Sequence, residues 1–304
     1  MRVLITGAGG QVGHDLCTVL SGVIPPGGAS TSLLGGAPVS AGEFDVIAAD
    51  RSMLDVTDRE AVSSFVASCS PEVIVHLAAY TAVDRAEADP EGARRGNEVA
   101  TANVSASADA TGAHLIAIST DYVFAGDRGR ALDERDATNP LSVYGATKLA
   151  GELACTSGAT IVRTSWVAGA AGRTVLNLAA DAATSGRELA FVDDQVGSLT
   201  NAADLAAGLV YFIRNQPGGL VHVAGTGSAS WFEVIAHAVE AAGGSRAQVR
   251  AISTAQLDPP PAATRPAYSP LISARSAELG FRPLPEWQDG VSRLVGALVS
   301  KGTR

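Results

Sequence analysis

Short apolar runs alternate along the chain with longer segments whose apolar residues recur at helical spacing. The short runs are bounded by turn residues, as is typical of buried strands. Six strands are predicted, at Val3–Ile5, Asp45–Ala49, Val73–Leu77, Leu115–Ser119, Thr160–Arg163 and Leu220–Val223. Five helices are predicted, at Gln11–Leu20, Asp58–Ser68, Asn97–Thr111, Val143–Ala154 and Ala202–Asn215. This alternation predicts an α/β fold, a doubly wound parallel sheet of the Rossmann type covered on both faces.

The strict alternation weakens after Gly169. We therefore expect a dinucleotide-binding domain at 1–170, with later segments crossing back into it, and a smaller C-terminal substrate-binding domain at 171–304. The proline-rich stretch 254–270 is expected to wrap the smaller domain, and a helical apolar pattern runs over 284–298. The Gly- and Pro-rich segment Gly22–Gly42 interrupts the step from the first helix to the second strand, which predicts a surface insertion or lid.

Composition narrows the class of protein. The 304 residues carry a formal net charge of -9, which opposes a general role in binding nucleic acid or anionic membranes. The three cysteines, Cys17, Cys69 and Cys155, show no CxxC spacing, so we expect reduced thiols. Neither a signal peptide nor an apolar run of about 20 residues is seen, so a soluble, cytoplasmic protein is predicted.

Three glycines follow the first predicted strand and open the first helix. Gly7, Gly10 and Gly13 allow a tight turn, and their segment, which includes Gln11 and Val12, points amide groups at a helix N-terminus toward a pyrophosphate. This context predicts dinucleotide binding.

Further cofactor contacts are expected at the carboxyl ends of the other strands. After the second strand, Asp50 would bond an unphosphorylated ribose, whereas Arg51 would accommodate a 2′-phosphate. Because the two neighbours favour different cofactors, we lean toward NADPH and leave NADH open. The remaining residues expected to line the cofactor are Asp55, Val56, Ala78, Ala79, Tyr80 and Ile118.

The predicted catalytic group is Thr120, Tyr144 and Lys148. Tyr144 and Lys148 lie four residues apart, on one face of a helix, where the cation would lower the phenol pKa from about 10 toward neutrality. Tyr144 would then supply a proton, and Lys148 would also contact the nicotinamide ribose. Thr120 follows the strand Leu115–Ser119, where its hydroxyl would hold a carbonyl for hydride attack. The five histidines show no metal-binding spacing, so no metal centre is predicted from motifs.

Several motifs together resemble the extended short-chain dehydrogenases/reductases, and within them the dTDP-4-dehydrorhamnose reductase family. These motifs are Gly7–Gly13, Thr81–Asp84 with Ala86–Glu87, Ser119–Phe124, Tyr144–Glu152, Arg163–Val167, Asp194–Gln195 with Gly197, Trp231, Arg265–Pro266 and Trp287. The resemblance covers nearly the whole chain apart from Gly22–Gly42.

The resemblance implies NAD(P)H-dependent reduction of the C4 ketone of dTDP-6-deoxy-L-lyxo-4-hexulose to dTDP-L-rhamnose. The substrate-binding residues would be Thr120, Asp121, Trp166 and Arg265. Trp166 would present a flat apolar wall to the sugar, Thr120 and Asp121 would bond its oxygens, and Arg265 would meet the diphosphate.

Two other functions stay open at this point. A nucleotide-sugar epimerase or dehydratase would recycle the hydride on a retained cofactor. A non-catalytic regulatory subunit of the methionine adenosyltransferase type would keep the fold without turnover. Related chains also carry an acidic metal contact where Asp15 stands, so Mg²⁺ bound through Asp15 is a weaker hypothesis, and a homodimer is left open.

Overall fold

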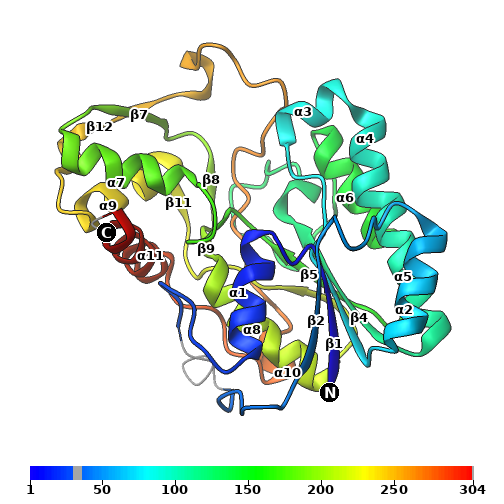
Figure 1. The fold of residues 1–304 in the computed structure, drawn as a ribbon. Coiled ribbons are helices and arrows are strands. Elements are labelled where there is room, and N and C mark those ends of the chain that lie inside the picture. The colour runs from blue at the N-terminus through cyan, green and yellow to red at the C-terminus, as the bar shows by residue number, and fades with distance from the viewer. Residues whose placement is uncertain (30–35, 303–304) are drawn as a thin grey trace.

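Six parallel strands form the central sheet of the computed structural model, which describes residues 1–29 and 36–302 (Figure 1). In order across the sheet they are β10 (Gly219–His222), β5 (Thr160–Thr164), β4 (His114–Thr120), β3 (Val73–His76), β1 (Arg2–Thr6) and β2 (Asp45–Ala49). The six predicted strands are confirmed, each end within one residue of its predicted place. The order reverses between β1 and β3, which predicts a ligand crevice outside their carboxyl ends.

Successive side chains of the strands enter two different apolar clusters. Val3 and Ile5 of β1 pack in one cluster with α1 (Gln11–Leu20) and α8 (Ala202–Asn215). Leu4 packs in another cluster, together with apolar side chains of α2 (Arg59–Cys69) and α5 (Ala100–Thr111). Because strand side chains alternate between faces, both faces of the sheet are buried and the strands read as continuous apolar runs.

The remaining elements lie between these strands and after them in the chain. They are α3 (Val83–Ala88), α4 (Pro90–Arg94), the π-helical turn η2 (Arg95–Val99), the 3-10 turn η3 (Asp121–Val123), α6 (Val143–Leu153), β6 (Val167–Ala168), α7 (Val175–Ser185), β7 (Leu189–Val192), β8 (Val196–Gly197), β9 (Thr200–Asn201), β11 (Ala229–Ser230), α9 (Trp231–Ala241), η4 (Arg246–Gln248), β12 (Val249–Ile252), η5 (Thr254–Gln256), α10 (Ser276–Leu279) and α11 (Trp287–Gly302). The five predicted helices are confirmed, although the third is preceded by α4 and η2.

A second body of structure lies beside the sheet and is built on α7, α9 and α11 (Figure 1). These helices bury one shared apolar cluster, and β12 pairs with β7 along its edge. Within 171–304, however, α8 and β10 belong to the larger body, since β10 pairs with β5. The division at residue 170 therefore remains a prediction.

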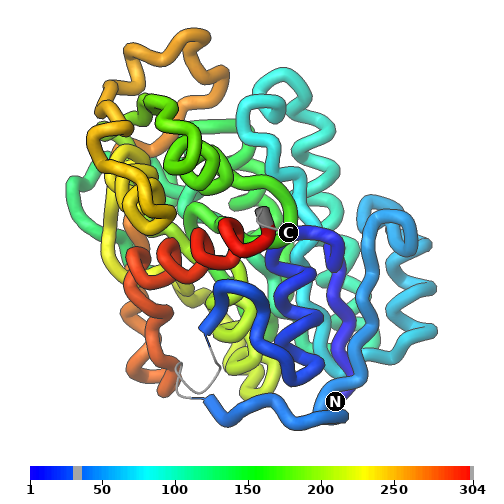
Figure 2. Tube along the Cα trace, turned by 60° about the vertical axis from the view of Figure 1, so that its left-hand side comes forward, coloured from blue at the N-terminus to red at the C-terminus, as the bar shows by residue number. Residues whose placement is uncertain are grey.

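The start of the segment Gly22–Gly42 is anchored against two helices. The Gly27 carbonyl accepts from Asn201 Nδ2 (2.8 Å) and Arg293 Nε (3.3 Å), and the Ala29 amide donates to Asp204 Oδ1 (2.8 Å). Figure 2 shows this blue segment beneath the red helix α11. The part of the predicted insertion at 30–35 lies outside the described residues.

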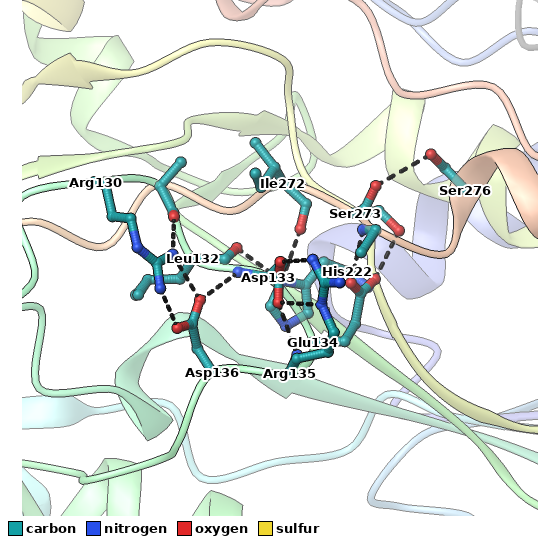
Figure 3. A network of polar contacts seen from close by, with 12 residues as sticks. Arg130, Leu132, Asp133, Glu134, Arg135, Asp136, His222, Ile272, Ser273 and Ser276 are labelled. Carbon is teal, nitrogen blue, oxygen red and sulfur yellow. Dashed lines mark hydrogen bonds and ion pairs between the residues drawn. The ribbon is translucent and has the colours of Figure 1, made fainter.

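The loop between η3 and α6 is fastened to the C-terminal half of the chain. Figure 3 shows Glu134 of this loop beside His222 and Ser273. The Glu134 carboxylate accepts from the His222 amide (2.8 Å), the Ser273 hydroxyl (2.6 Å) and the Ala274 amide (2.8 Å). The loop leading to α6 is thus fixed at the β10 edge of the sheet. Throughout 1–29 and 36–302, no helix has the length and apolar character needed to cross a bilayer.

Candidate active site

Close backbone packing holds the glycine turn between β1 and α1. Gly7 has a φ of 71°, and a Cβ there would lie 2.6 Å from the Ala78 amide nitrogen. A Cβ at Gly13 would lie 2.5 Å from the Gly7 carbonyl oxygen. Only glycine fits such contacts. At the N-cap, Gly10 has no side chain to accept from the first-turn amides of α1, which leaves them available to a pyrophosphate.

The acid and the base that follow β2 are both exposed, and they differ in their contacts. Asp50 Oδ1 accepts from the Ser52 amide (2.8 Å), the Ser52 hydroxyl (2.6 Å) and the Met53 amide (3.2 Å), and these bonds lower the pKa of Asp50. Further along, Asp55 Oδ1 accepts from the Thr57 amide and hydroxyl. Arg51 lies on the surface between these two turns. The geometry therefore leaves the predicted preference for NADPH undecided.

A buried asparagine, not identified from the sequence, fixes the loop that follows β3. Asn97 Oδ1 accepts from the Tyr80 amide (2.8 Å), while its Nδ2 donates to the Tyr80 carbonyl (3.1 Å) and to the Thr147 hydroxyl (3.0 Å). Asn97 lies in the π-helical turn η2, a conformation often found at functional sites. It joins the predicted cofactor wall, Ala78–Tyr80, to helix α6. In the sequence, Asn97 stands out only as a polar residue at the start of a predicted helix.

Thr120, Tyr144 and Lys148 meet at the carboxyl end of β4. The Thr120 hydroxyl lies close enough to the Tyr144 phenol to affect its pKa. The Lys148 ammonium donates to the carbonyl of Ile118 (2.6 Å), and so ties α6 to the strand. The ring of Tyr122 packs edge-on against that of Tyr144, with centroids 5.5 Å apart. The structure thus brings the three predicted catalytic residues together and packs Tyr122, predicted only as part of the motif Ser119–Phe124, against Tyr144.

The protein alone holds the pKa of Tyr144 high, contrary to the expected lowering. Burial raises the pKa of Tyr144 to about 12, although the Thr120 hydroxyl opposes the shift. Burial also lowers the pKa of Lys148 to about 8, with the Glu152 carboxylate opposing. Desolvation penalises the charged form of each group. The attraction predicted from their helical spacing does not contribute to the pKa of either group, because the ammonium of Lys148 is held by the Ile118 carbonyl. Tyr144 is therefore a protonated phenol at neutral pH.

Asp121 is buried, with only 1% of its surface exposed, and hydroxyl groups surround it. Its Oδ2 accepts from the Ser269 hydroxyl (2.6 Å) and its Oδ1 from the Thr120 hydroxyl (3.2 Å). Burial raises the pKa of Asp121 to about 6, against the effect of these hydrogen bonds. Asp121 therefore orients Thr120 and fastens the segment that contains Ser269 in this structure.

Trp166 and Arg265, two predicted substrate-binding residues, come from distant parts of the chain. Trp166 follows β5 and has a φ of 45°, a strained value for a bulky residue that is found mainly at functional sites. Arg265, within the proline-rich stretch, donates to both Asp84 carboxylate oxygens, at 3.0 and 2.6 Å. The guanidinium lowers the pKa of Asp84 to about 2. The group predicted to meet a diphosphate is thus already paired with α3.

Buried polar atoms without a hydrogen-bond partner collect near the carboxyl ends of the strands. Such atoms are costly unless a ligand or water satisfies them. Within the described part of the chain they include Gln11 Oε1, His76 Nε2, the Tyr80 hydroxyl, Ser119 Oγ and Thr164 Oγ1. Together with the open amides of α1, they fit a polar dinucleotide at this edge.

The surroundings of Asp15 do not support the magnesium hypothesis. Asp15 lies on α1, is 1% exposed and contacts His14 Nδ1 at 3.3 Å. Its burial raises the pKa of the carboxyl group. Over residues 1–29 and 36–302, no group of three His, Cys, Asp or Glu side chains is arranged to hold a metal ion.

Comparison with known proteins places the chain in a family. A family model described as the RmlD substrate binding domain matches residues 33–300. The chain is 37% identical to dTDP-4-dehydrorhamnose reductase of Mycolicibacterium smegmatis, over 99% of this chain and 87% of the relative.

Two solved structures agree with this match. The dTDP-4-dehydrorhamnose reductase of Clostridium acetobutylicum superposes with a TM-score of 0.86 at 31% identity, over 97% of this chain and 99% of that one. The enzyme of Bacillus anthracis, in complex with NADP, gives 0.83 at 34% identity, over 96% and 98%. The chain therefore belongs to the dTDP-4-dehydrorhamnose reductase family of NAD(P)-dependent reductases.

Proposed function

We propose that the protein uses NADPH to reduce the C4 ketone of dTDP-6-deoxy-L-lyxo-4-hexulose to dTDP-L-rhamnose. The observation that supports this most directly is the cluster of Thr120, Tyr144 and Lys148 at the end of β4, in a chain of this family. NADPH, when bound, supplies the hydride. NADH remains a candidate reductant, because both Asp50 and Arg51 follow β2.

The cofactor would be held by groups along the carboxyl edge. The turn Gly7–Gly13 presents the amides of α1 to the pyrophosphate. Asp50, Arg51, Asp55 and Val56 would surround the adenosine half, and Ala78–Tyr80 with Ile118 would line the other half. The proposed cofactor-binding residues are Gly7, Gly10, Gln11, Val12, Gly13, Asp50, Arg51, Asp55, Val56, Ala78, Ala79, Tyr80, Ile118, Tyr144 and Lys148.

The side chains of the protein bind the ketone of the substrate and transfer a proton to its oxygen. Thr120 donates a hydrogen bond to the ketone oxygen and polarises the carbonyl. The Tyr144 phenol donates its proton to the same oxygen as the alkoxide forms. Lys148, with a pKa of about 8, is largely cationic at neutral pH and stabilises the phenolate that is left.

The family to which the chain belongs favours reduction over the alternative chemistry. An epimerase or dehydratase begins by removing a proton from a sugar hydroxyl, which requires a phenolate. A ketone reductase instead begins with a protonated phenol, which is the resting form that the burial of Tyr144 favours. A regulatory subunit without turnover would have no need for Thr120, Tyr144 and Lys148 to be assembled.

A coupled assay tests the proposal. The ketosugar is generated enzymatically, the loss of NADPH absorbance is followed, and the sugar nucleotide produced is identified by NMR. We expect NADPH oxidation only when the ketosugar is present, because the hydride needs a held carbonyl acceptor, and dTDP-L-rhamnose as product. No oxidation, or a different product, would overturn the proposed function. A parallel run with NADH decides the cofactor preference.

A further inference from the structure

Two tryptophans from different parts of the fold stack face to face beside the candidate active site. The rings of Trp166 and Trp231 lie 4.1 Å apart between centroids, with an angle of 7° between their planes. Trp166 follows β5 of the central sheet, whereas Trp231 is the first residue of α9 in the smaller body. Trp231 therefore covers one face of the indole that is predicted to meet the sugar.

The two-stranded sheet β8–β11 adjoins both rings, since Gly197 of β8 lies against Trp166 and β11 ends directly before Trp231. Its register pairs Gly197 with Ala229, two residues before Trp231. A Cβ at Gly197 would lie 2.5 Å from Cε2 of Trp166, which is closer than any real side-chain contact. Only glycine at this position lets the edge of the Trp166 ring lie against the strand.

The backbone of Trp166 needs this support. Its φ of 45° places a large L residue in the left-handed region, a strained conformation that persists only when neighbours hold it. One such contact is the Thr200 amide, which donates to the Trp166 carbonyl at 3.2 Å. The stack with Trp231 is a second, acting on the side chain.

We propose that Trp231 and Gly197 are positioning residues that hold the Trp166 ring toward the sugar and thereby set the affinity for the sugar nucleotide. The proposal rests on the proposed function, in which Trp166 contacts the sugar. Trp231 acts through Trp166, so its loss affects binding of the ketosugar and leaves binding of NADPH unchanged. Stacked aromatic pairs contribute about 0.5–1.5 kcal/mol, so we expect the KM for the ketosugar to rise roughly twofold to tenfold.

Steady-state kinetics of Trp231→Ala and Trp231→Phe provide the first test. The alanine variant should show the raised KM for ketosugar with an unchanged KM for NADPH, and the phenylalanine variant should restore most of the affinity because its ring still stacks. Gly197→Ala should raise the same KM, since the added methyl group displaces the indole. Equal changes in both KM values, or an alanine variant with wild-type KM, would overturn the proposal.

Trp287→Phe is the matched control, because Trp287 belongs to the same apolar cluster and its ring packs against His237. This variant should keep both KM values. A rise in the ketosugar KM equal to that of Trp231→Ala would show that any disturbance of the cluster has the same effect, and would count against a specific role for Trp231.

A fluorescence measurement tests the positioning independently of activity. The chain has three tryptophans, so the double variants Trp231→Phe/Trp287→Phe and Trp231→Ala/Trp287→Phe each keep Trp166 alone. Without a stacking partner, Trp166 should emit at longer wavelength and be quenched more strongly by acrylamide. Identical emission and quenching in the two variants would refute the proposal. If wild-type protein turns over no ketosugar, the proposed function fails, while this comparison still decides whether Trp231 holds Trp166.

Discussion

Burial decides the ionisation of the residues at the end of β4. Burial favours the neutral form of three residues, because each lies where its charged form is poorly solvated. It raises the pKa of Tyr144 to about 12 and that of Asp121 to about 6, and it lowers the pKa of Lys148 to about 8. A phenol kept protonated beside a threonine hydroxyl suits proton donation to a ketone. The same burial makes these residues costly to charge.

Replacing Tyr144 by Phe removes the proposed proton donor and keeps most of the packing. We expect kcat to fall about a hundredfold or more, because general acid catalysis contributes on that scale, with little change in the affinity for NADPH. Thr120 and Lys148 remain in place, so cofactor titration serves as the internal control. Near-normal turnover would exclude Tyr144 as the acid.

Asp121 should make the stability depend on pH. Its pKa in the folded state is raised from 3.8 to about 6, so the folded protein binds a proton more tightly than the unfolded chain. The stability that this proton confers is complete below about pH 4 and is lost as the pH rises through about 6. Asp121→Asn cannot titrate. As the pH rises from about 4.5 to about 7, wild type should therefore lose this stability while the variant does not, so the free energy of unfolding of the variant should increase relative to that of wild type.

Urea denaturation at these two pH values measures that difference. Carboxylates with lowered pKa, such as Asp84 and Asp136, change the stability of both proteins in the opposite sense and cancel in the comparison. A difference between variant and wild type that stays constant with pH would mean that Asp121 does not titrate in this range.

At the level of elements, the turn from β1 to α1 depends on how closely its backbone segments approach. A Cβ at Gly13 would lie 2.5 Å from the Gly7 oxygen and 2.7 Å from Ala8 Cα, whereas a Cβ at Gly9 would meet only Asp50 Cβ at 3.8 Å. The first position has no room for a methyl group, and the second has an ordinary contact. The two glycines therefore differ although they look alike in the sequence.

Gly13→Ala should accordingly destabilise the protein, by about 1–3 kcal/mol as is usual for overpacking, since the backbone of the turn must shift. Gly9→Ala is the matched variant and should change the free energy of unfolding by less than about 0.5 kcal/mol. Denaturant unfolding of both variants provides the comparison. Equal destabilisation would show that the close approach at Gly13 is not what requires glycine.

Across the whole molecule, the proline-rich stretch ties the smaller body to the nucleotide-binding side. Arg265 pairs with Asp84 on α3, and Ser269 donates to Asp121 at the end of β4. Figure 1 shows this orange segment descending from the top of the molecule toward α3. Segments about 180 residues apart in sequence thus meet at the candidate site.

A double-mutant cycle of Asp84→Asn and Arg265→Gln measures the strength of this tie. Asp84 is 48% exposed, so water screens the pair, and we expect a coupling free energy of about 0.5–1 kcal/mol in thermal or urea unfolding. High salt should reduce the coupling. Strictly additive effects of the two substitutions would mean that the ion pair contributes nothing to holding the stretch.

Local chemistry in the sequence determined the six strands, the glycine turn and the grouping of Thr120 with Tyr144 and Lys148. Alternating apolar runs specify a parallel sheet, and the carboxyl ends of such strands share one edge, so residues that follow strands must meet there. These features depend on short-range pattern and on one general rule of topology.

Only the tertiary structure decided the contacts between distant segments and their consequences. Asn97 beneath Tyr80, Trp231 on Trp166, and Arg265 on Asp84 join residues whose separation along the chain carries no periodic signal. The pKa of Tyr144 was wrongly expected to be lowered, because helical spacing reveals a neighbouring cation but not the desolvation of the buried phenol. Burial is a property of the assembled fold, and no local pattern specifies its extent.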